Sequence, residues 1–347
     1  MNRTPLLSVN ALTVSFGNKK KLVEVLHNIS FDVFENEIVG IVGESGSGKS
    51  VTSLSIMGLL PKKLANLSGN VIFEEKVLLQ ITETEFRNIR GKDIAMIFQE
   101  PMSALNPSLK CGFQVAEILR LHLKMNVSEA KKETISLFEK VKLPRPAEIY
   151  NSYPHQISGG QMQRVMIAMA IACKPKLLIA DEPTTALDVT VQKEILSLLK
   201  SIQQETKMAM LFISHDLSLV SEIADRVVVM YKGDIIENAT TEEIFKNPKA
   251  AYTKALLASR PSLNVRLAKL PTIASIADKS FKPREVKPVE RAKRHKHIYT
   301  KKPILEIVNL EKYYFSNVGM FSKAEVVKAV DDISFTVFEG ETLGLVG

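Results

Sequence analysis

The segment GESGSGKS, residues 43–50, constrains the fold of this chain more than any other feature. It follows a strand-like run, EIVGIV, and its glycines precede Lys49 and Ser50 at the spacing of a phosphate-binding loop that joins a strand to a helix. In such a loop backbone amides point at phosphate oxygens, the lysine reaches the β- and γ-phosphates, and the serine binds Mg²⁺. The other interpretation is a plain glycine turn before a helix. The segment predicts a nucleotide site in an α/β fold.

A second candidate element is LLIADE, residues 177–182. The apolar run is typical of a buried strand, and it ends at Asp181 and Glu182, at the strand end where α/β proteins bind ligands. We expect Asp181 to hold Mg²⁺ through water and Glu182 to polarise the attacking water. An apolar run before two acids is common in proteins, and it is the upstream phosphate loop that gives this one a specific meaning.

Two glycines at the start of a predicted helix form a third candidate, ISGGQMQR at residues 157–164. The pattern fits a simple turn and cap, or a second helix N-terminus that binds phosphate. One nucleotide does not need two such termini from one domain. The second terminus therefore suits an ATP that is bound by a facing copy of the domain.

The remaining periodicity indicates strands that alternate with helices. Residues 6–16 and 29–34 have strand character, and the runs MAMLFIS and RVVVMY follow a helix-like stretch at residues 190–204. Residues 128–141 carry apolar side chains at helical spacing, which predicts a packed helical subdomain. We therefore expect an α/β fold with a largely parallel sheet.

The positive charge of the chain is concentrated in one segment. The formal net charge is +8, and residues 260–302 contain 13 Lys and Arg against three acids. Several prolines and few large apolar residues predict an ill-ordered basic linker at residues 259–302, after a domain at residues 5–258. Charge in a proline-broken linker lacks the organised basic face of nucleic-acid binding, so no nucleic-acid partner is expected.

The sequence beyond this linker repeats the start of the chain. ISFTVFEGETLGLVG at residues 333–347 matches ISFDVFENEIVGIVG at residues 29–43, and residues 305–310 resemble residues 7–12. The repeat predicts that residues 303–347 begin a second copy of the domain, truncated before its phosphate loop. We therefore expect the chain to be the front part of a longer tandem protein.

Cysteine content and hydropathy indicate the cellular compartment in which this chain is expected. Cys111 and Cys173 fit no metal-ligand spacing and indicate a reduced, cytosolic environment. No apolar run reaches the length of a membrane-spanning helix, so we expect any membrane role to come through a partner.

Three further residues are candidates because of their positions. Gln99 follows the strand-like IAMIF and His215 follows MAMLFIS, so both enter loops where polar groups converge on a nucleotide, although polar residues at strand ends are ordinary. Phe16 stacks on adenine or packs against the sheet, and the sequence leaves both interpretations open.

Taken in order, GESGSGKS, Gln99, ISGGQ, LLIADE, ALD and His215 resemble the ATP-binding cassette family over residues 5–258. The resemblance implies a mostly parallel sheet core, an N-terminal antiparallel β part and a helical subdomain, with ATP and Mg²⁺ as cofactors. It implies catalytic roles for Glu182 as base, His215 at the γ-phosphate and Gln99 as sensor. The metal ligands that it implies are Ser50, Gln99 and Asp181. The nucleotide-binding residues that it implies are Phe16, Gly43, Glu44, Ser45, Gly46, Ser47, Gly48, Lys49 and Ser50 for one ATP, and Ser158, Gly159, Gly160, Gln161 and Asp188 at the interface with an opposing domain.

The segments FQEPMSALNP, residues 98–107, and ADEPTTALDVTVQ, residues 180–192, resemble the dipeptide and oligopeptide importer ATPases, and the repeat resembles their fused two-cassette versions. The resemblance implies an ATPase peripheral to the cytoplasmic face of the inner (plasma) membrane. It would power separate transmembrane permease subunits, with a periplasmic or extracellular substrate-binding protein as an indirect partner. Ile157 departs from the usual leucine, and the absence of cysteine from residues 258–302 predicts no iron–sulfur cluster. A soluble tandem-cassette ATPase that acts on ribosomes or nucleic acid is the alternative.

Overall fold

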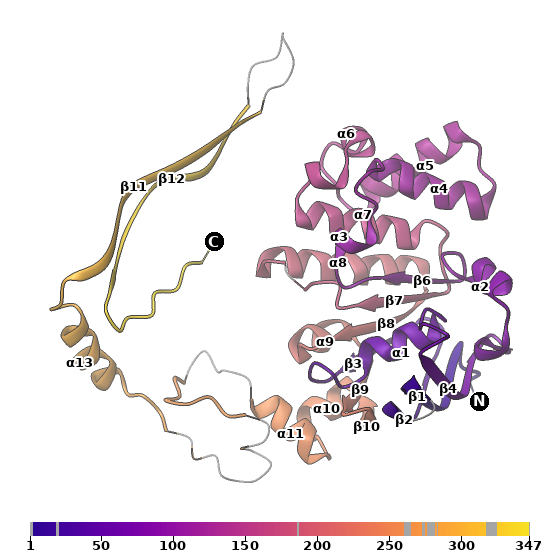
Figure 1. Ribbon diagram of the computed structural model, residues 1–347, viewed down its shortest axis with the longest axis horizontal. Helices are drawn as coiled ribbons and strands as arrows, with labels where there is room; N and C mark the ends of the chain where they lie inside the picture. The colour runs from indigo at the N-terminus through magenta and orange to yellow at the C-terminus, as the bar shows by residue number, and fades with distance from the viewer. Residues whose placement is uncertain are drawn as a thin grey trace. The chain divides into compact units, whose positions relative to one another are not determined.

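The structure is a computed structural model (Figure 1), and it describes residues 3–18, 21–185, 187–259, 265–272, 275, 282, 284–316 and 325–346. The chain divides into two compact units, Met1–Ala258 and Ser259–Gly347. The first unit contains two sheets with their helices, and the second contains a helix and a two-stranded hairpin.

A six-stranded sheet in the order β10-β9-β3-β8-β7-β6 forms the centre of the first unit. Neighbouring strands pair in parallel except for β10, which is antiparallel to β9. β3, β7 and β8 are buried along their whole length, which explains their nearly continuous apolar composition. The strand bounds are β3 (Ile38–Val42), β6 (Ile94–Ile97), β7 (Leu177–Asp181), β8 (Ala209–Ser214), β9 (Arg226–Tyr231) and β10 (Asp234–Thr240).

A smaller antiparallel sheet in the order β2-β1-β4-β5 packs against one side of this core. One apolar cluster joins Val9 and Leu12 of β1 and Ile56 of the first helix to Ile41 and Leu211 of the central sheet. The fold class expected from the sequence is thereby confirmed. The bounds are β1 (Leu7–Asn18), β2 (Lys21–Val33), β4 (Ala65–Phe73), β5 (Lys76–Val77), α1 (Lys49–Ile56), η1 (Leu78–Gln80) and α2 (Glu83–Ile89).

Helices cover the other side of the central sheet. The predicted helix at residues 128–141 is confirmed as α5, which starts at a capping box between Asn126 and Glu129 and buries Leu137 and Phe138. The second apolar cluster joins these helices to Phe212 of β8. The helix bounds are α3 (Pro101–Ala104), α4 (Cys111–Leu123), α5 (Val127–Lys140), α6 (Pro146–Asn151), η2 (Pro154–Gln156), α7 (Gly159–Ile171), α8 (Val189–Thr206), α9 (Leu217–Ile223), α10 (Thr241–Lys246) and α11 (Ala251–Ala258).

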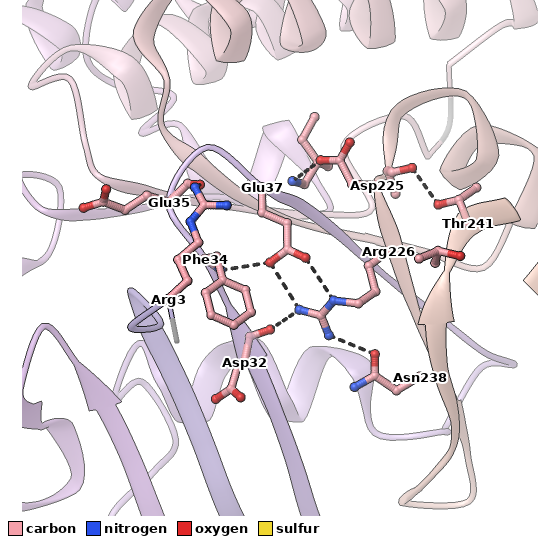
Figure 2. Close-up of polar contacts among 12 residues, drawn as sticks. Arg3, Asp32, Phe34, Glu35, Glu37, Asp225, Arg226, Asn238 and Thr241 are labelled. Carbon is pink, nitrogen blue, oxygen red and sulfur yellow. Dashed lines mark hydrogen bonds and ion pairs between the residues drawn. The ribbon is translucent and has the colours of Figure 1, made fainter. Parts of the chain in front are cut away.

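A polar network joins the two sheets at the N-terminal ends of β3 and β9 (Figure 2). Arg226 at the start of β9 donates to the carboxylate of Glu37, to the side-chain oxygen of Asn238 in β10 and to the backbone carbonyl of Asp32 in β2. The backbone N–H of Ile38 donates to Asp225 at 2.8 Å. One arginine therefore connects strands of both sheets, at the end of β3 away from the phosphate loop.

The second unit contains α13 (Pro288–Ile298), β11 (Pro303–Ser316) and β12 (Glu325–Phe338). The sequence predicted an ill-ordered linker across residues 259–302, and the structure instead forms a helix in its last part. Pro288 stands at the first turn, where a missing N–H costs nothing, and the following Glu, Arg, Ala and Lys are good helix formers. Residues 260–264 and most of 273–283 lie outside the described residues.

The hairpin of the second unit repeats the β1–β2 hairpin in its pairing. Leu7 pairs with Val33 and Leu305 with Val337, and the same correspondence holds for the pairs Val9–Phe31 and Ile307–Phe335, and Leu12–Ile29 and Leu310–Ile333. The irregularities also correspond, because Ala11 and Asn309 both have positive φ and both donate from the backbone N–H to a serine hydroxyl across the hairpin. The sequence repeat is therefore a structural repeat.

Candidate active site

The phosphate loop lies between β3 and α1, as its sequence predicts. Gly46 and Gly48 have φ values of 79° and 103°, a conformation that a glycine adopts without strain. A Cβ on Gly43 would lie 2.2 Å from the backbone oxygen of Met230 in β9. The loop therefore needs glycine for two reasons, which are backbone shape at residues 46 and 48 and close packing at residue 43.

Lys49 is buried beneath this loop, with 5% of its surface exposed. Its Nζ donates to the backbone carbonyls of Gly43 and Glu44, both at 2.9 Å. Burial lowers the pKa of Lys49, and the nearby carboxylates of Glu182 and Asp181 oppose that effect. An ammonium has three N–H donors, so two carbonyls orient the group and the third donor remains for a phosphate.

Asp181 lies at the C-terminal end of β7 and receives two hydroxyls from α1. Ser50 Oγ donates to Oδ1 at 3.3 Å, and Ser53 Oγ donates to Oδ2 at 3.2 Å. Burial raises the pKa of Asp181, while these two hydrogen bonds act to lower it. A carboxylate beside a serine hydroxyl is an oxygen donor set that suits Mg²⁺, so Ser50 and Asp181 are chemically able to hold this ion.

Another feature of the loop fits a phosphate ligand. Ser47 Oγ is buried, and within the described part of the chain it has no hydrogen-bond partner. A buried hydroxyl without a partner is costly unless a bound molecule satisfies it. The loop thus offers a polar atom that a nucleotide would complete.

Glu182 is the residue on which the predicted polar side chains converge. Its Oε2 accepts hydrogen bonds from Gln99 Nε2 at 3.3 Å and Thr185 Oγ1 at 3.0 Å, and lies 3.1 Å from His215 Nδ1. Glu182 has a φ of 47°, in the left-handed region that is unfavourable for residues other than glycine. The structure brings both Gln99 and His215, which the sequence singled out, to this carboxylate. The sequence did not single out Thr185, whose only signal was its position shortly after the two acids.

A cavity of about 780 Å³ opens beside these groups, and a second of about 180 Å³ adjoins it along the phosphate loop. The lining of the first includes Glu44, Gln99, Glu182 and His215, and also Leu256 from α11, which the sequence did not single out. The second is lined by the loop and by Val25 of β2. Among the described residues neither lining contains Phe16, which is half-buried and packs against the core between the sheets.

Residues 158–161 form the start of α7. Ser158 is the N-cap, and its side chain and that of Gln161 bond to each other's backbone N–H at 3.3 and 3.0 Å. An added Cβ on Gly159 would meet nothing within 4 Å, whereas one on Gly160 would lie 3.1 Å from Val191. Asp188 caps α8 in the same way, by accepting from the backbone N–H of Val191. Neither cavity includes these five capping and glycine positions in its described lining, so the structure does not bring them to Glu182.

Comparison with known proteins decides the family. Residues 26–185 match the family model of the ABC transporter, and residues 236–284 match that of the oligopeptide/dipeptide transporter, C-terminal region. The dipeptide transport ATP-binding protein DppD of Bacillus subtilis is 49% identical over 80% of this chain and 83% of its own length. This chain belongs to the ABC transporter ATP-binding proteins.

Other relatives extend the comparison. The glutathione import ATP-binding protein GsiA of Shigella dysenteriae is 41% identical over 99% of this chain, and the chain spans 56% of the length of that relative. The ATP-binding cassette MJ0796, solved as a dimer bound to ADP and Pi, has a TM-score of 0.60 at 28% identity and covers 68% of this chain and 98% of its own. The structure of cbiO1 from Clostridium perfringens has a TM-score of 0.59 at 26% identity and covers 73% and 95%.

These matches do not support the expectation of two fused cassettes. The cassette match covers a single cassette, residues 26–185, so a fused two-cassette chain is not shown. The matched C-terminal region, residues 236–284, extends past residue 258 into the segment predicted from the sequence to be a linker. In the described part of the chain no helix combines the length and the apolar character needed to cross a membrane.

Proposed function

We propose that this chain binds MgATP at the two adjoining cavities and hydrolyses it to power a membrane importer of peptides or peptide-like substrates. The observation that carries the proposal is the convergence of Gln99, Thr185 and His215 on the Glu182 carboxylate, at the mouth of a phosphate loop with a buried lysine. The named activities of the relatives, dipeptide transport and glutathione import, support the substrate class.

Each side chain has a defined part in this proposal. Lys49 directs its remaining N–H donor to the β- and γ-phosphates, while Ser50 and Asp181 hold the metal ion, with Gln99 as a further ligand. When bound by these residues, Mg²⁺ would supply positive charge beside the phosphates. Glu182 accepts a proton from the attacking water, and His215, whose side chain is 60% exposed on the cavity, contacts the γ-phosphate. For Phe16, which lies outside the described linings of both cavities, a contact with adenine is supported by the family resemblance alone.

The proposal includes a second contact surface for nucleotide. Ser158, Gly159, Gly160 and Gln161 present a helix N-terminus, which favours phosphate. Because these residues lie outside the two cavities, they suit an ATP held by a facing cassette, with Asp188 at the same interface. Closure of two cassettes around two nucleotides, followed by hydrolysis and reopening, would drive separate permease subunits that dock near Gln99 and the helices that follow it. Such a protein is peripheral to the cytoplasmic face of the inner membrane, and a substrate-binding protein outside that membrane is an indirect partner.

The facing cassette is proposed to be the one that begins with β11 and β12. The support is the residue-by-residue correspondence of the two hairpins and the exposure of the second. Leu7, Leu12 and Ile29 are 0%, 0% and 1% exposed, and their counterparts Leu305, Leu310 and Ile333 are 46%, 45% and 40% exposed. The first hairpin is covered by β4 and the central sheet, and in the second hairpin the corresponding described positions are exposed.

The test compares wild type with Glu182→Gln and Lys49→Ala. Glu182→Gln should bind ATP as tightly as wild type and lose most hydrolysis, because only the water-orienting carboxylate is gone. Lys49→Ala should lose tight ATP binding, because the phosphates lose their buried cation. Turnover by Glu182→Gln equal to that of wild type would remove Glu182 from this role. In wild type, the hydrolysis rate per molecule should rise with protein concentration, since pairing completes the site.

A further inference from the structure

The phosphate loop is held from outside by α11, the last helix of the first unit. The hydroxyl oxygen of Tyr252 accepts a hydrogen bond from the backbone N–H of Glu44, with an N···O distance of 3.3 Å. Lys49 and Thr52 also bond to the backbone of the loop, but both belong to α1. Tyr252 is 208 residues away in the sequence, so a separate element fastens the loop.

The fastened peptide is the one that orients Lys49. The Lys49 ammonium donates to the carbonyls of Gly43 and Glu44, the two residues at the start of the loop. Tyr252 binds the amide of this same pair. The direction of the third N–H of Lys49, which is the one left for phosphate, therefore depends on a peptide that the tyrosine hydroxyl holds in place.

Two contacts hold α11 in place, one at the start of the helix and one at the Tyr252 ring. Oε1 and Oε2 of Glu237 in β10 accept hydrogen bonds from the backbone N–H groups of Lys249 and Ala250, at 2.8 and 3.1 Å, at the start of the helix. The Tyr252 ring packs on the ring of Tyr231 with a centroid distance of 4.3 Å. The cap restrains the helix and the Tyr231 ring restrains the Tyr252 ring. Together they restrict the position of the Tyr252 hydroxyl.

The same face of α11 reaches the cavity. Leu256 follows Tyr252 by four residues, the spacing that places side chains on one helix face, and it lines the cavity beside Glu182 and His215. The helix also lies within the matched C-terminal region, residues 236–284. This C-terminal region therefore forms part of the wall of the nucleotide site.

We propose that Tyr252 is a positioning residue of the ATPase site, which acts through the Glu44 amide on the orientation of Lys49. The proposal rests on the proposed function, since it concerns the same nucleotide. Tyr252 does not need to touch ATP. It raises the affinity for the phosphates by keeping the start of the loop in the conformation that points the third N–H of Lys49 at them. The affinity for phosphate therefore depends on the packing of α11 against the loop.

The test is Tyr252→Phe in the full chain, with Tyr231→Phe as the matched control. Tyr252→Phe keeps the ring and its packing on Tyr231 and removes only the hydroxyl, whereas Tyr231→Phe removes a hydroxyl from the partner ring. The measurements are the Kd for MgATP by calorimetry and hydrogen exchange of the peptide that spans residues 43–50 without nucleotide. Loss of one neutral hydrogen bond should raise the Kd about three- to tenfold and speed exchange at the loop, with a fall in Tm of about 4 °C or less.

Two outcomes overturn the proposal. An unchanged Kd in Tyr252→Phe would show that the hydroxyl does not position Lys49, whatever hydrogen exchange records. Equal weakening in Tyr231→Phe, which leaves the Tyr252 hydroxyl in place, would show that the loss of affinity does not come from the hydrogen bond to Glu44. Absence of ATP binding in wild type would instead refute the proposed function, so the two failures are distinguishable.

Discussion

The guanidinium of Arg226 donates to both carboxylate oxygens of Glu37, at 2.9 and 3.2 Å (Figure 2). The two side chains are only 18% and 15% exposed, and Glu37 also accepts a hydrogen bond from the backbone N–H of Phe34. Removal of one partner leaves the other charge largely shielded from water. The pair therefore links β2, β3 and β9. Removal of either side chain should lower the free energy of unfolding, because the remaining charge has no partner.

We predict that Arg226→Met destabilises the first unit by about 3 kcal/mol, because the Glu37 carboxylate loses its counter-charge and Asn238 and Asp32 lose a donor. Thermal unfolding followed by circular dichroism measures the effect. The control is Lys246→Met, which breaks an i,i+4 pair with Glu242 whose side chains are 76% and 73% exposed and should cost about 0.5 kcal/mol or less. Equal losses in both variants would contradict the shielding argument.

His27 and Asp234 give a pH-dependent contribution to stability. The hydrogen bond between His27 Nδ1 and the accepting Oδ2 of Asp234, at 3.2 Å, raises the pKa of His27 above its usual value of 6.5, and Glu24 acts in the same direction. A histidine with a raised folded-state pKa stabilises the protein fully below pH 6.5, and this contribution is lost as the pH rises through the folded-state pKa.

Asp234→Asn should therefore lower the Tm at pH 6 and have little effect at pH 8.5. Both side chains are more than a third exposed, so solvent screening limits the difference to about 1 kcal/mol or less. The comparison of thermal unfolding at the two pH values decides the prediction. A larger loss of Tm at pH 8.5 than at pH 6 would contradict the prediction.

The two glycines of α7 offer a way to separate folding from function. Gly159→Ala should leave the Tm unchanged, because an added Cβ meets nothing within 4 Å. It should still lower hydrolysis about tenfold or more, because the methyl group stands where the facing nucleotide is proposed to bind. Gly344→Ala is the matched control, since it too adds a methyl group to open space. Full activity of Gly159→Ala in a chain that hydrolyses ATP would argue against a nucleotide at this helix end.

The two cysteines should react slowly in the folded chain. Burial raises the pKa of the Cys111 and Cys173 thiols to about 11. The thiolate is the reactive form, so at pH 8 we expect reaction with a disulfide reagent to be about a hundredfold slower than in urea. Absorbance of the released thiol follows the reaction, and the Cys173→Ser variant isolates Cys111. A rate for folded Cys111 close to that of the unfolded chain would contradict its burial.

The sequence predicted the features whose signal is local. The phosphate loop, β7 with Asp181 and Glu182, and α5 follow from glycine spacing, an apolar run and helical periodicity. Thr185, Tyr252 and Leu256 carry no local pattern, because their roles arise only when distant segments pack together. The helix α13 was missed for a different reason, since charge and proline content indicate poor burial but do not prevent a solvent-exposed helix from forming after Pro288.

The uncovered β11–β12 hairpin has a practical consequence for anyone who purifies this chain. In the described residues β11 pairs only with β12, and the hairpin exposes Val326, Val327, Tyr314 and Phe315. A strand with a free edge and apolar side chains is a template for pairing with another chain. Concentrated stocks should therefore form soluble clusters that grow on storage, while a chain shortened to residues 1–302 stays dispersed. Hydrolysis rates measured at high protein concentration would then reflect association through the hairpin as well as pairing of cassettes. The same measurement on the shortened chain separates the two effects.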